Sequence, residues 1–377
     1  MTDLSSLKAL RLREAPSRES LREVCETIQP LSPALLLREQ KRWDSLCKPL
    51  HSLGLLERIW AQIRAIQGGA DDSLRPALSL VFGADNGIVR EGVTQCGPEV
   101  TAQVLKNMCA RKSTLPLFDE AVGWDSLIIN LGTAVSTEDC PEVLERCIRQ
   151  GGTRNFLREA AMTERESLQA IFYGYDLALE AKKQGLRLLA GGEMGIGNSS
   201  TSTCLAAVLL GIQPSTVCGR GAGLSDEAFQ TKKEVIDAAA RRIEPDSDPL
   251  TCLTELGGLD LAALCGLYLG AAAAKLPVLL DGLMSFSAAA VAYTIAPSAR
   301  DYWIPTHFPA EPCAQALMRF MDIDPPLHFQ LALGEGAGAL LMVPLLEMTR
   351  RVYRELPSFE AGSVEAYQDF QDREGQS

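Results

Sequence analysis

The sequence is poor in histidine, and its cysteines are scattered along the chain. Only His51, His307 and His328 occur among 377 residues, and none of the 11 cysteines falls in a C-x-x-C pair. Zinc sites need several such ligands at short spacing, so the sequence predicts no metal site. Cysteines without this spacing are typical of reduced and mostly buried thiols, which favours a cytoplasmic protein.

Signals for secretion and for membrane insertion are also missing. Residues 1–20 are polar and of mixed charge, with no apolar core of signal-peptide length. The apolar stretch 261–280 is rich in alanine and glycine and is interrupted by Lys275 and Pro277. This composition predicts a buried helix followed by a strand rather than a membrane span.

Positive charge is the minority. The chain has 36 lysines and arginines against 48 aspartates and glutamates, which gives a formal net charge of −12. A surface of this sign repels a polyphosphate backbone, so we expect no nucleic-acid partner. A small anion must then be bound by a local pocket rather than by the overall field of the protein.

Short apolar runs that end in small or polar residues alternate with helical patterns through most of the chain. The runs lie at 78–85, 126–133, 186–198, 276–282 and 302–305. This alternation predicts an α/β fold with a mostly parallel, Rossmann-like sheet covered by helices on both faces. In such sheets the ligand site lies at the carboxyl ends of the strands, where this sequence places Asp85, Glu193 and Asp281.

Both ends of the chain have helical patterns. We expect residues 1–70 and 343–377 to form one small helical domain, and residues 71–342 to form a large α/β catalytic domain. The sequence TERE at 163–166 matches a capping box and should start a helix. The polar tail after Val364 is expected to be disordered.

A glycine-rich segment, GGEMGIGNSSTST (191–203), follows an apolar run and opens a helical pattern. Its free backbone N–H groups and the helix N-terminus would bind phosphate, and a simple tight turn is the alternative. The absence of a Gly-Lys-Ser/Thr or G-x-G-x-x-G pattern argues against a Walker loop and a dinucleotide-dependent dehydrogenase. A second glycine cluster, 218–223, precedes Lys232, which would either reach a phosphate or lie in solvent.

Glu193 and Glu335 are acids flanked by glycine that follow apolar runs. Partial desolvation would raise the pKa of each carboxyl and prepare it to accept a proton near neutral pH. For Glu335 the alternative is structural, because an acid there can cap a helix that begins near Ala337. His307 is open to acid–base chemistry or to a hydrogen-bonded structural role.

Seven motifs occur together in one order: FGADNGIVREGVTQCGPEVTAQ, GTRNF, GEMGIGNSST, GRGAGL, LGGLDLAALCGLYLGAAAAKLPVLLDG, IPTHFPAE and LGEGAGA. From about residue 48 to the end of the last helix, the chain resembles nicotinate-nucleotide–dimethylbenzimidazole phosphoribosyltransferases. The resemblance implies that nicotinate of nicotinate mononucleotide is exchanged for a cobamide lower-ligand base, giving an α-riboside phosphate. It implies no metal or other cofactor, and a homodimer in which one small domain covers the other subunit's site.

The resemblance also assigns roles to individual residues. Glu335 matches the catalytic base, and Glu193 matches a second active-site carboxylate. Met194 and Leu333 match apolar walls of the lower-ligand pocket. The positions implied for the nucleotide and its phosphate are Gly195, Ile196, Gly197, Asn198, Lys232 and Gly334.

The chain departs from the family pattern on the lower-ligand side. Asn86 stands where histidine is common, and Cys96 and Val104 stand at or near a usual serine and glutamine. Pro309 replaces a serine that helps to hold phosphate, and His51 replaces a glycine. The polar losses favour a phenolic acceptor such as phenol or p-cresol, which a heterodimeric branch of the family attaches through oxygen. Asn86 and Pro309 also support an alternative, a non-catalytic subunit that completes a paralogous enzyme.

Overall fold

The computed structural model describes residues 3–69 and 72–368. A six-stranded parallel sheet forms its centre, with the strand order β3-β2-β1-β4-β5-β6. The strands are β1 (Ala77–Ala84), β2 (Asp125–Gly132), β3 (Leu144–Glu145), β4 (Leu188–Met194), β5 (Val278–Leu280) and β6 (Trp303–Pro305). The order reverses between β1 and β4, which is where sheets of this kind open a crevice.

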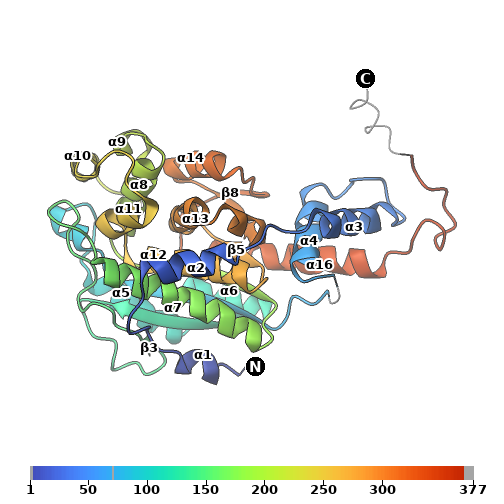
Figure 1. Cartoon of the computed structure of the whole chain (residues 1–377), viewed down its shortest axis with the longest axis horizontal. Helices are drawn as coiled ribbons and strands as arrows, with labels where there is room; N and C mark the ends of the chain where they lie inside the picture. Colours follow the sequence, from blue (N-terminus) through green and yellow to red (C-terminus); the bar gives the residue numbers. More distant parts are fainter. Residues whose placement is uncertain (1–2, 70–71, 369–377) are drawn as a thin grey trace.

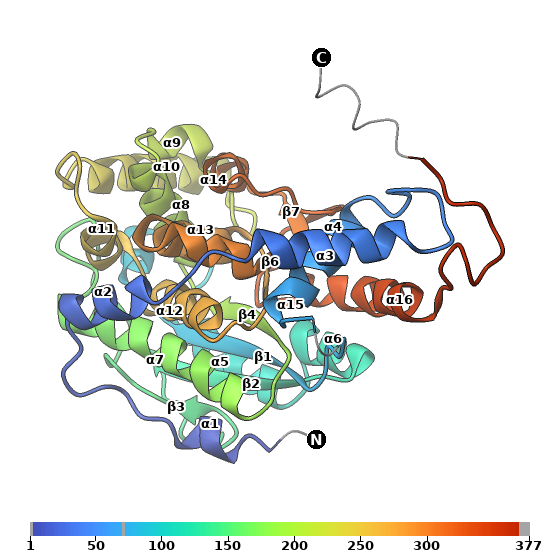
Figure 2. The ribbon, with the colours of Figure 1, turned by 45° about the vertical axis from the view of Figure 1, so that its right-hand side comes forward.

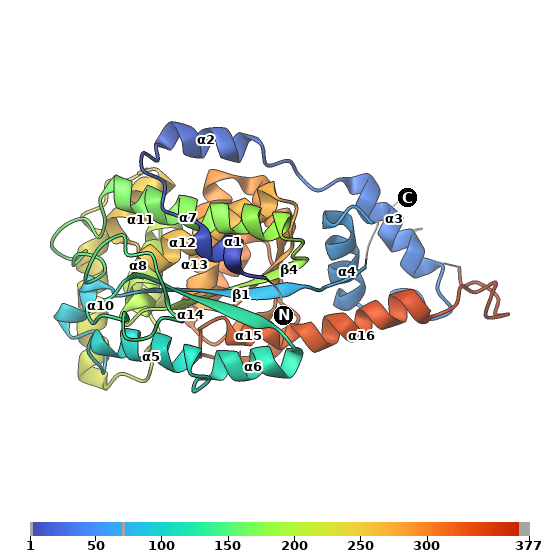
Figure 3. The same cartoon turned by 90° about the horizontal axis from the view of Figure 1, so that it is seen from below.

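Helices cover both faces of the sheet (Figure 3). One face carries α7 (Glu164–Lys183), α12 (Leu259–Ala273) and α13 (Leu283–Ile295), and the other carries α5 (Glu99–Cys109) and α6 (Thr114–Val122). The predicted fold class is therefore confirmed. The apolar stretch that begins at 261 forms α12, which is buried along its length and leads into β5. No helix in the described residues is long and apolar enough to cross a membrane.

The start of α7 is set by the local sequence signal that predicted it. Thr163 caps α7 by accepting the backbone N–H of Glu166, and the Glu166 side chain accepts the N–H of Thr163 in return. This is the predicted capping box. Around the carboxyl edge of the sheet the chain adds α8 (Asn198–Leu209), α9 (Pro214–Val217), α10 (Asp226–Ala240), α11 (Pro249–Leu256), α14 (Pro312–Met321) and the 3-10 turn η1 (Gly87–Glu91). A second 3-10 turn, η2 (Pro297–Tyr302), leads into the start of β6.

Three helices from both parts of the chain form a cluster beside the sheet (Figure 1). They are α3 (Pro33–Asp44), α4 (Leu55–Ile66) and α16 (Met342–Glu355), joined to the sheet through the short α15 (Ala337–Leu340). Tyr353 packs against Trp43 and Trp60, and its hydroxyl donates to the buried Glu39 carboxylate at 2.5 Å. A mixed aromatic and ionic core thus holds the three helices together.

The N-terminal helices lie elsewhere. Figure 3 shows α2 (Arg18–Glu26) crossing over α7 and α12, and α1 (Ser5–Ala9) also contacts α7. Residues 5–26 therefore pack on the large α/β part, although they fall inside the predicted small domain. The boundaries at 70 and 342 stay a prediction. Of the predicted disordered tail, residues 365–368 form no helix or strand, and the rest lies outside the described residues.

A small second sheet was not predicted. Its strands, β7 (His307–Pro309) and β8 (Leu327–Leu331), pair in parallel, and β7 contacts α14 (Figure 2). Residues 328–330 of β8 are exposed, so the strand has neither a buried run nor a clear alternation. The two-residue β3 was missed as well, because it is too short to leave a pattern.

Candidate active site at the carboxyl edge of the sheet

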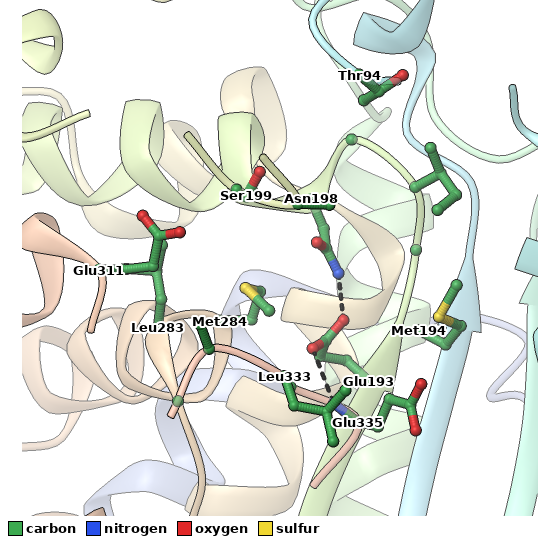
Figure 4. Close-up of a pocket in the computed structure, with 18 of the residues that line it drawn as sticks. Thr94, Glu193, Met194, Asn198, Ser199, Leu283, Met284, Glu311, Leu333 and Glu335 are labelled. Carbon is green, nitrogen blue, oxygen red and sulfur yellow. Dashed lines mark hydrogen bonds between the residues drawn. The ribbon is translucent and has the colours of Figure 1, made fainter. Parts of the chain in front are cut away.

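A cavity of about 260 Å³ opens at the carboxyl ends of β4 and β5. Loops from far apart in the sequence complete it, chiefly residues 93–96, 220–224 and 331–335. In Figure 4, Glu193 lies between the Asn198 amide and the backbone of Glu335, while Met194 and Glu311 lie on opposite sides of the cavity. The cavity is therefore at the edge where the sheet topology predicts a ligand site.

Glu335 lies in a strained turn. Its φ is +65°, between Gly334 at +81° and Gly336 at +85°. A non-glycine residue in this region is uncommon and is often found at functional sites. The turn packs directly on β4, since a Cβ atom at Gly192 would lie 2.2 Å from the carbonyl oxygen of Glu335. The glycine of the strand is thus needed for the close approach of the two segments.

The Glu335 side chain is partly buried and lines the cavity. Burial raises the pKa of its carboxyl, while the nearby backbone N–H of Leu115 lowers it. Its Oε2 atom is buried and has no hydrogen-bond donor among the described residues, and Glu335 forms no ion pair there. Glu335 does not cap α15, whose N-cap is Gly336 without a side-chain hydrogen bond, so that alternative is wrong. The free acceptor is suited to taking up a proton.

Glu193 is the second-last residue of β4 and is 5% exposed. Its Oε2 accepts a short hydrogen bond from the Asn198 amide, and its Oε1 accepts the backbone N–H of Glu335 at 3.4 Å. Burial raises the pKa of Glu193 well above its usual range, and the neighbouring carboxylates of Asp260 and Asp281 raise it further. The two predicted glutamates are thus brought together, and one of them supports the backbone of the other.

Two more buried carboxylates lie behind Glu193. Asp260, at the start of α12, is 3.4 Å from the Asn198 amide, and burial raises its pKa to about 6. Asp281, directly after β5, accepts the N–H groups of Gly336 and Ala339, and burial raises its pKa to about 7. The sequence placed Asp281 at this edge but gave no signal for Asp260, which lies within an apolar helix.

The candidate anion end is the turn before α8. Gly197 has a φ of +93° and is the N-cap of α8, so backbone N–H groups at the start of that helix are available to a ligand. A Cβ atom at Gly195 would lie 2.3 Å from the carbonyl oxygen of Ala84, so the turn packs closely on β1. Gly195, Ile196, Gly197 and Asn198 all line the cavity, and Gly334 lines it from the opposite loop, while their binding of a phosphate stays a prediction.

Lys232 lies one layer behind this turn. It is 1% exposed, which rules out the solvated alternative, and it is not among the residues that line the cavity. Its Nζ donates to Ser199 Oγ at 3.1 Å and to the Gly219 carbonyl at 3.0 Å. Burial lowers the pKa of the ammonium group. Its charge therefore supports the anion end through Ser199, which lines the cavity and which the sequence did not single out.

The predicted lower-ligand residues divide into two groups. Met194, Leu333 and Cys96 line the cavity. Val104, on α5, does not line it, and Asn86 is buried behind the turn, where its Oδ1 accepts the Thr201 hydroxyl at 2.8 Å. Other lining residues that sequence reasoning missed are Val93, Thr94, Gln95, Arg220, Leu283, Met284 and Glu311.

Pro309 and His307, which the sequence analysis singled out, also line the cavity. Pro309 faces the cavity, so its missing hydroxyl and N–H bear directly on the site. His307 also lines it, with Nδ1 3.2 Å from Thr306 Oγ1. Burial lowers the pKa of His307 to about 4, which keeps the ring neutral near pH 7. A hydrogen-bonded structural histidine is the role that this environment favours.

One described group of side chains has the composition of a metal site. Asp44, His51 and Glu57 bring possible ligand atoms within 4.8 Å of one another between α3 and α4. The Lys48 ammonium, however, is 2.7 Å from Glu57 and would repel a cation. The group also lies in the helical cluster rather than in the cavity.

An open parallel sheet with a glycine-rich turn and paired acids at its carboxyl edge is typical of Rossmann-like enzymes. A family model described as phosphoribosyltransferase matches residues 28–364. The chain belongs to the nicotinate-nucleotide–dimethylbenzimidazole phosphoribosyltransferase family, and it is an enzyme of the pentosyltransferase class.

Individual relatives match over nearly their whole length. The nicotinate-nucleotide–dimethylbenzimidazole phosphoribosyltransferase of Ruminiclostridium cellulolyticum is 37% identical over 92% of this chain and 98% of its own. That of Clostridium acetobutylicum is 36% identical over 92% and 99%. The crystal structure of CobT from Thermus thermophilus superposes with a TM-score of 0.84 at 33% identity, covering 89% of this chain and all of that one. The family resemblance is confirmed.

Proposed function

We propose that this enzyme transfers the phosphoribosyl group of nicotinate mononucleotide from nicotinate to an aromatic lower-ligand base, giving an α-riboside phosphate. The observation that carries the proposal is the partly buried carboxylate of Glu335, whose Oε2 atom has no hydrogen-bond donor among the described residues. It lines a cavity whose other end is a glycine-rich helix N-terminus. Such a cavity can hold a nucleotide phosphate at one end and an acceptor beside a base at the other.

The reaction asks little of the protein at the leaving group. The bond between the ribose carbon and the pyridinium nitrogen breaks with its electrons moving to nitrogen, so nicotinate departs without a general acid. The acceptor atom attacks the opposite face of the sugar and loses its proton to Glu335. Positioning of both reactants in one cavity supplies much of the remaining acceleration.

Glu193 is proposed to act on the sugar. Positive charge builds on the ribose in the transition state, and a buried carboxylate nearby becomes more acidic as that charge develops. The Asn198 amide on one oxygen and the Glu335 N–H on the other hold the Glu193 carboxyl in place. This support from two segments suits a group that must stabilise charge without moving.

The acceptor is proposed to be dimethylbenzimidazole or a phenol. The names of the relatives favour the benzimidazole. Low polarity favours the phenol, because Val93, Met194 and Leu333 line the cavity and Cys96 stands where a serine is usual. Asn86 and Val104 lend this choice less support, since neither faces the cavity.

Two oligomeric states go with the two acceptors. A homodimer follows from the family resemblance, and a heterodimer with a paralogous subunit goes with the phenolic acceptor. The second candidate function is a non-catalytic subunit of such a heterodimer, and the observation in its favour is Pro309 in the cavity lining. The presence of both Glu193 and Glu335 in that lining favours the active enzyme.

The test is a product assay with the purified full chain. Nicotinate mononucleotide is supplied with dimethylbenzimidazole, phenol or both, and nicotinate and the riboside phosphate are quantified by mass spectrometry. Turnover of either acceptor by the chain alone supports the proposal, and competition between them identifies the preferred one. Release of no nicotinate with any acceptor, alone or with a paralogous partner, would refute the proposal.

A further inference from the structure

The turn that carries Glu335 needs anchors outside itself. Three residues in succession, Gly334 to Gly336, have positive φ values, and the middle one bears a side chain. L-residues disfavour this region, so such a conformation persists only where the surroundings impose it. Glu193 supplies one weak anchor by accepting the Glu335 N–H at 3.4 Å.

Asp281 supplies the stronger anchor of the Glu335 turn. Its Oδ2 accepts the Gly336 N–H at 3.1 Å and its Oδ1 accepts the Ala339 N–H at 2.9 Å. Gly336 follows Glu335 directly and is the N-cap of α15, and Ala339 lies within that helix. Asp281, from another segment of the chain, thus provides the carboxylate at the N-terminus of α15 that the sequence had suggested for Glu335 itself.

Asp281 is itself fixed. It is 3% exposed, and its backbone N–H donates to Ser285 Oγ at 3.0 Å. The Ser285 hydroxyl pairs in turn with the hydroxyl of Tyr268 at 2.5 Å, in the buried core. The Glu335 turn is therefore connected through Asp281 to β5 and to the rigid α12 and α13 layer.

The Asp281 carboxylate accepts its hydrogen bonds from the backbone of the Glu335 turn and of α15. Among the described residues it forms no ion pair, and it is not part of the cavity lining. A Cβ atom at Gly338 would lie 2.8 Å from its Oδ1 and 2.4 Å from His307 Cε1, so the packing around it is tight. Its side chain is therefore behind the cavity wall and acts through the backbone that it holds.

We propose that Asp281 is a positioning residue, whose two carboxylate oxygens fix the backbone of Gly336 and Ala339 and thereby set the carboxylate of Glu335 at the reacting atoms. The proposal rests on the proposed function, in which Glu335 is the base. Asparagine is nearly isosteric but offers one acceptor oxygen, so its NH₂ group would face one of the two N–H donors.

The test is Asp281→Asn in the full chain, assayed with nicotinate mononucleotide and the acceptor that the product assay identifies. We expect kcat to fall about 10- to 100-fold with little change in KM, because a small displacement of a catalytic group is enough for such a loss. The acidic limb of the kcat profile should also move to lower pH, as a displaced Glu335 loses its burial. Asp119→Asn is the matched control: Asp119 is 2% exposed, bonds Ser79 at the other end of β1, and should keep the wild-type profile.

A double variant separates positioning from other roles. In a Glu335→Gln background, Asp281→Asn should lower the residual rate no more than about twofold, because the two act as one unit. The inference would be overturned if the rate losses of the two single variants multiplied in the double variant. It would also be overturned if Asp281→Asn kept the wild-type kcat while Glu335→Gln was inactive. Full activity in Glu335→Gln would instead overturn the proposed function. If Asp281→Asn does not fold, Ser285→Ala should show the same pattern at smaller size, and an unchanged kcat there would refute the inference.

Discussion

At the scale of single residues, the left-handed backbone of Glu335 lowers the stability of the protein and is kept for the position of its side chain. A left-handed non-glycine residue costs about 1 kcal/mol or more, so Glu335→Gly should leave the free energy of unfolding equal or raise it by up to about 1 kcal/mol. The same variant should lose the transfer activity. Urea unfolding measured beside Glu335→Gln, which keeps the strained backbone, tests this. A destabilised glycine variant would show that the turn is not strained.

The raised pKa of Glu335 predicts how activity depends on pH. A base must be deprotonated, so kcat/KM should fall as the pH drops through the pKa of Glu335, which burial places above its ordinary 4.5. Rate measurements from pH 4 to 8 on the wild type and on Glu335→Gln check this. An acidic limb that is the same in both proteins would assign it to another group.

The sequence predicted the acids of the site better than their surroundings. Glu193 and Asp281 were expected at the carboxyl edge because strand ends leave a pattern of apolar run and polar stop. Asp260 left none, since it starts a helix that is otherwise apolar. Lys232 and Asn86 were placed in contact with ligand, but the close packing of Gly195 and Gly197 puts a layer of backbone in front of Asn86. Such layering depends on tertiary packing and cannot be inferred from order along the chain.

At the scale of elements, the pair α7 and α12 depends on glycine. A Cβ atom at Gly266 would lie 1.7 Å from the carbonyl oxygen of Ile171, and one at Gly174 would lie 1.9 Å from that of Ala263. Gly266→Ala should therefore destabilise the protein by about 2–3 kcal/mol through overpacking, even though alanine is the better helix former. Denaturant unfolding measures this, and a variant as stable as the wild type would contradict it.

The predicted elements are those with a strong period or a clean end. Five of the six strands of the main sheet were located from apolar runs, and the capping box at Thr163 gave the start of α7. The pair β7 and β8 was missed because an exposed short strand has no hydrophobic pattern. The docking of α2 on α7 was missed for a different reason: helical periodicity shows that a helix forms, but not which surface it packs on.

At the scale of the whole molecule, buried acids set the response of stability to pH. Burial raises the pKa of Asp119 and Asp260 to about 6 and that of Asp281 to about 7, against 3.8 in an ordinary setting. Between about pH 4 and pH 7 the folded chain thus binds protons that the unfolded chain has released. Stability must therefore fall as pH rises through this window. His307, whose pKa burial lowers from 6.5 to about 4, opposes this trend with one group between about pH 4 and 6.5. Carboxyls with lowered pKa, such as Glu39 and Glu166, oppose it only below about pH 4.5.

We expect the free energy of unfolding to be larger at pH 5.5 than at pH 7.5, by an amount on the order of a few kcal/mol. The urea midpoint should therefore be higher at pH 5.5. Asp119→Asn should reduce that difference, because it removes one of the shifted groups without touching the cavity. A midpoint that is constant or rises from pH 5.5 to pH 7.5 would mean that these acids are ionised in the folded protein.

The role of Glu335 is tested most directly by the single-turnover rate of nicotinate release, measured for the wild type and Glu335→Gln at saturating acceptor. Loss of a positioned base should slow release about 100- to 10,000-fold, while the affinity for nicotinate mononucleotide changes little. Equal release rates in the two proteins would show that the carboxylate beside the cavity takes no proton.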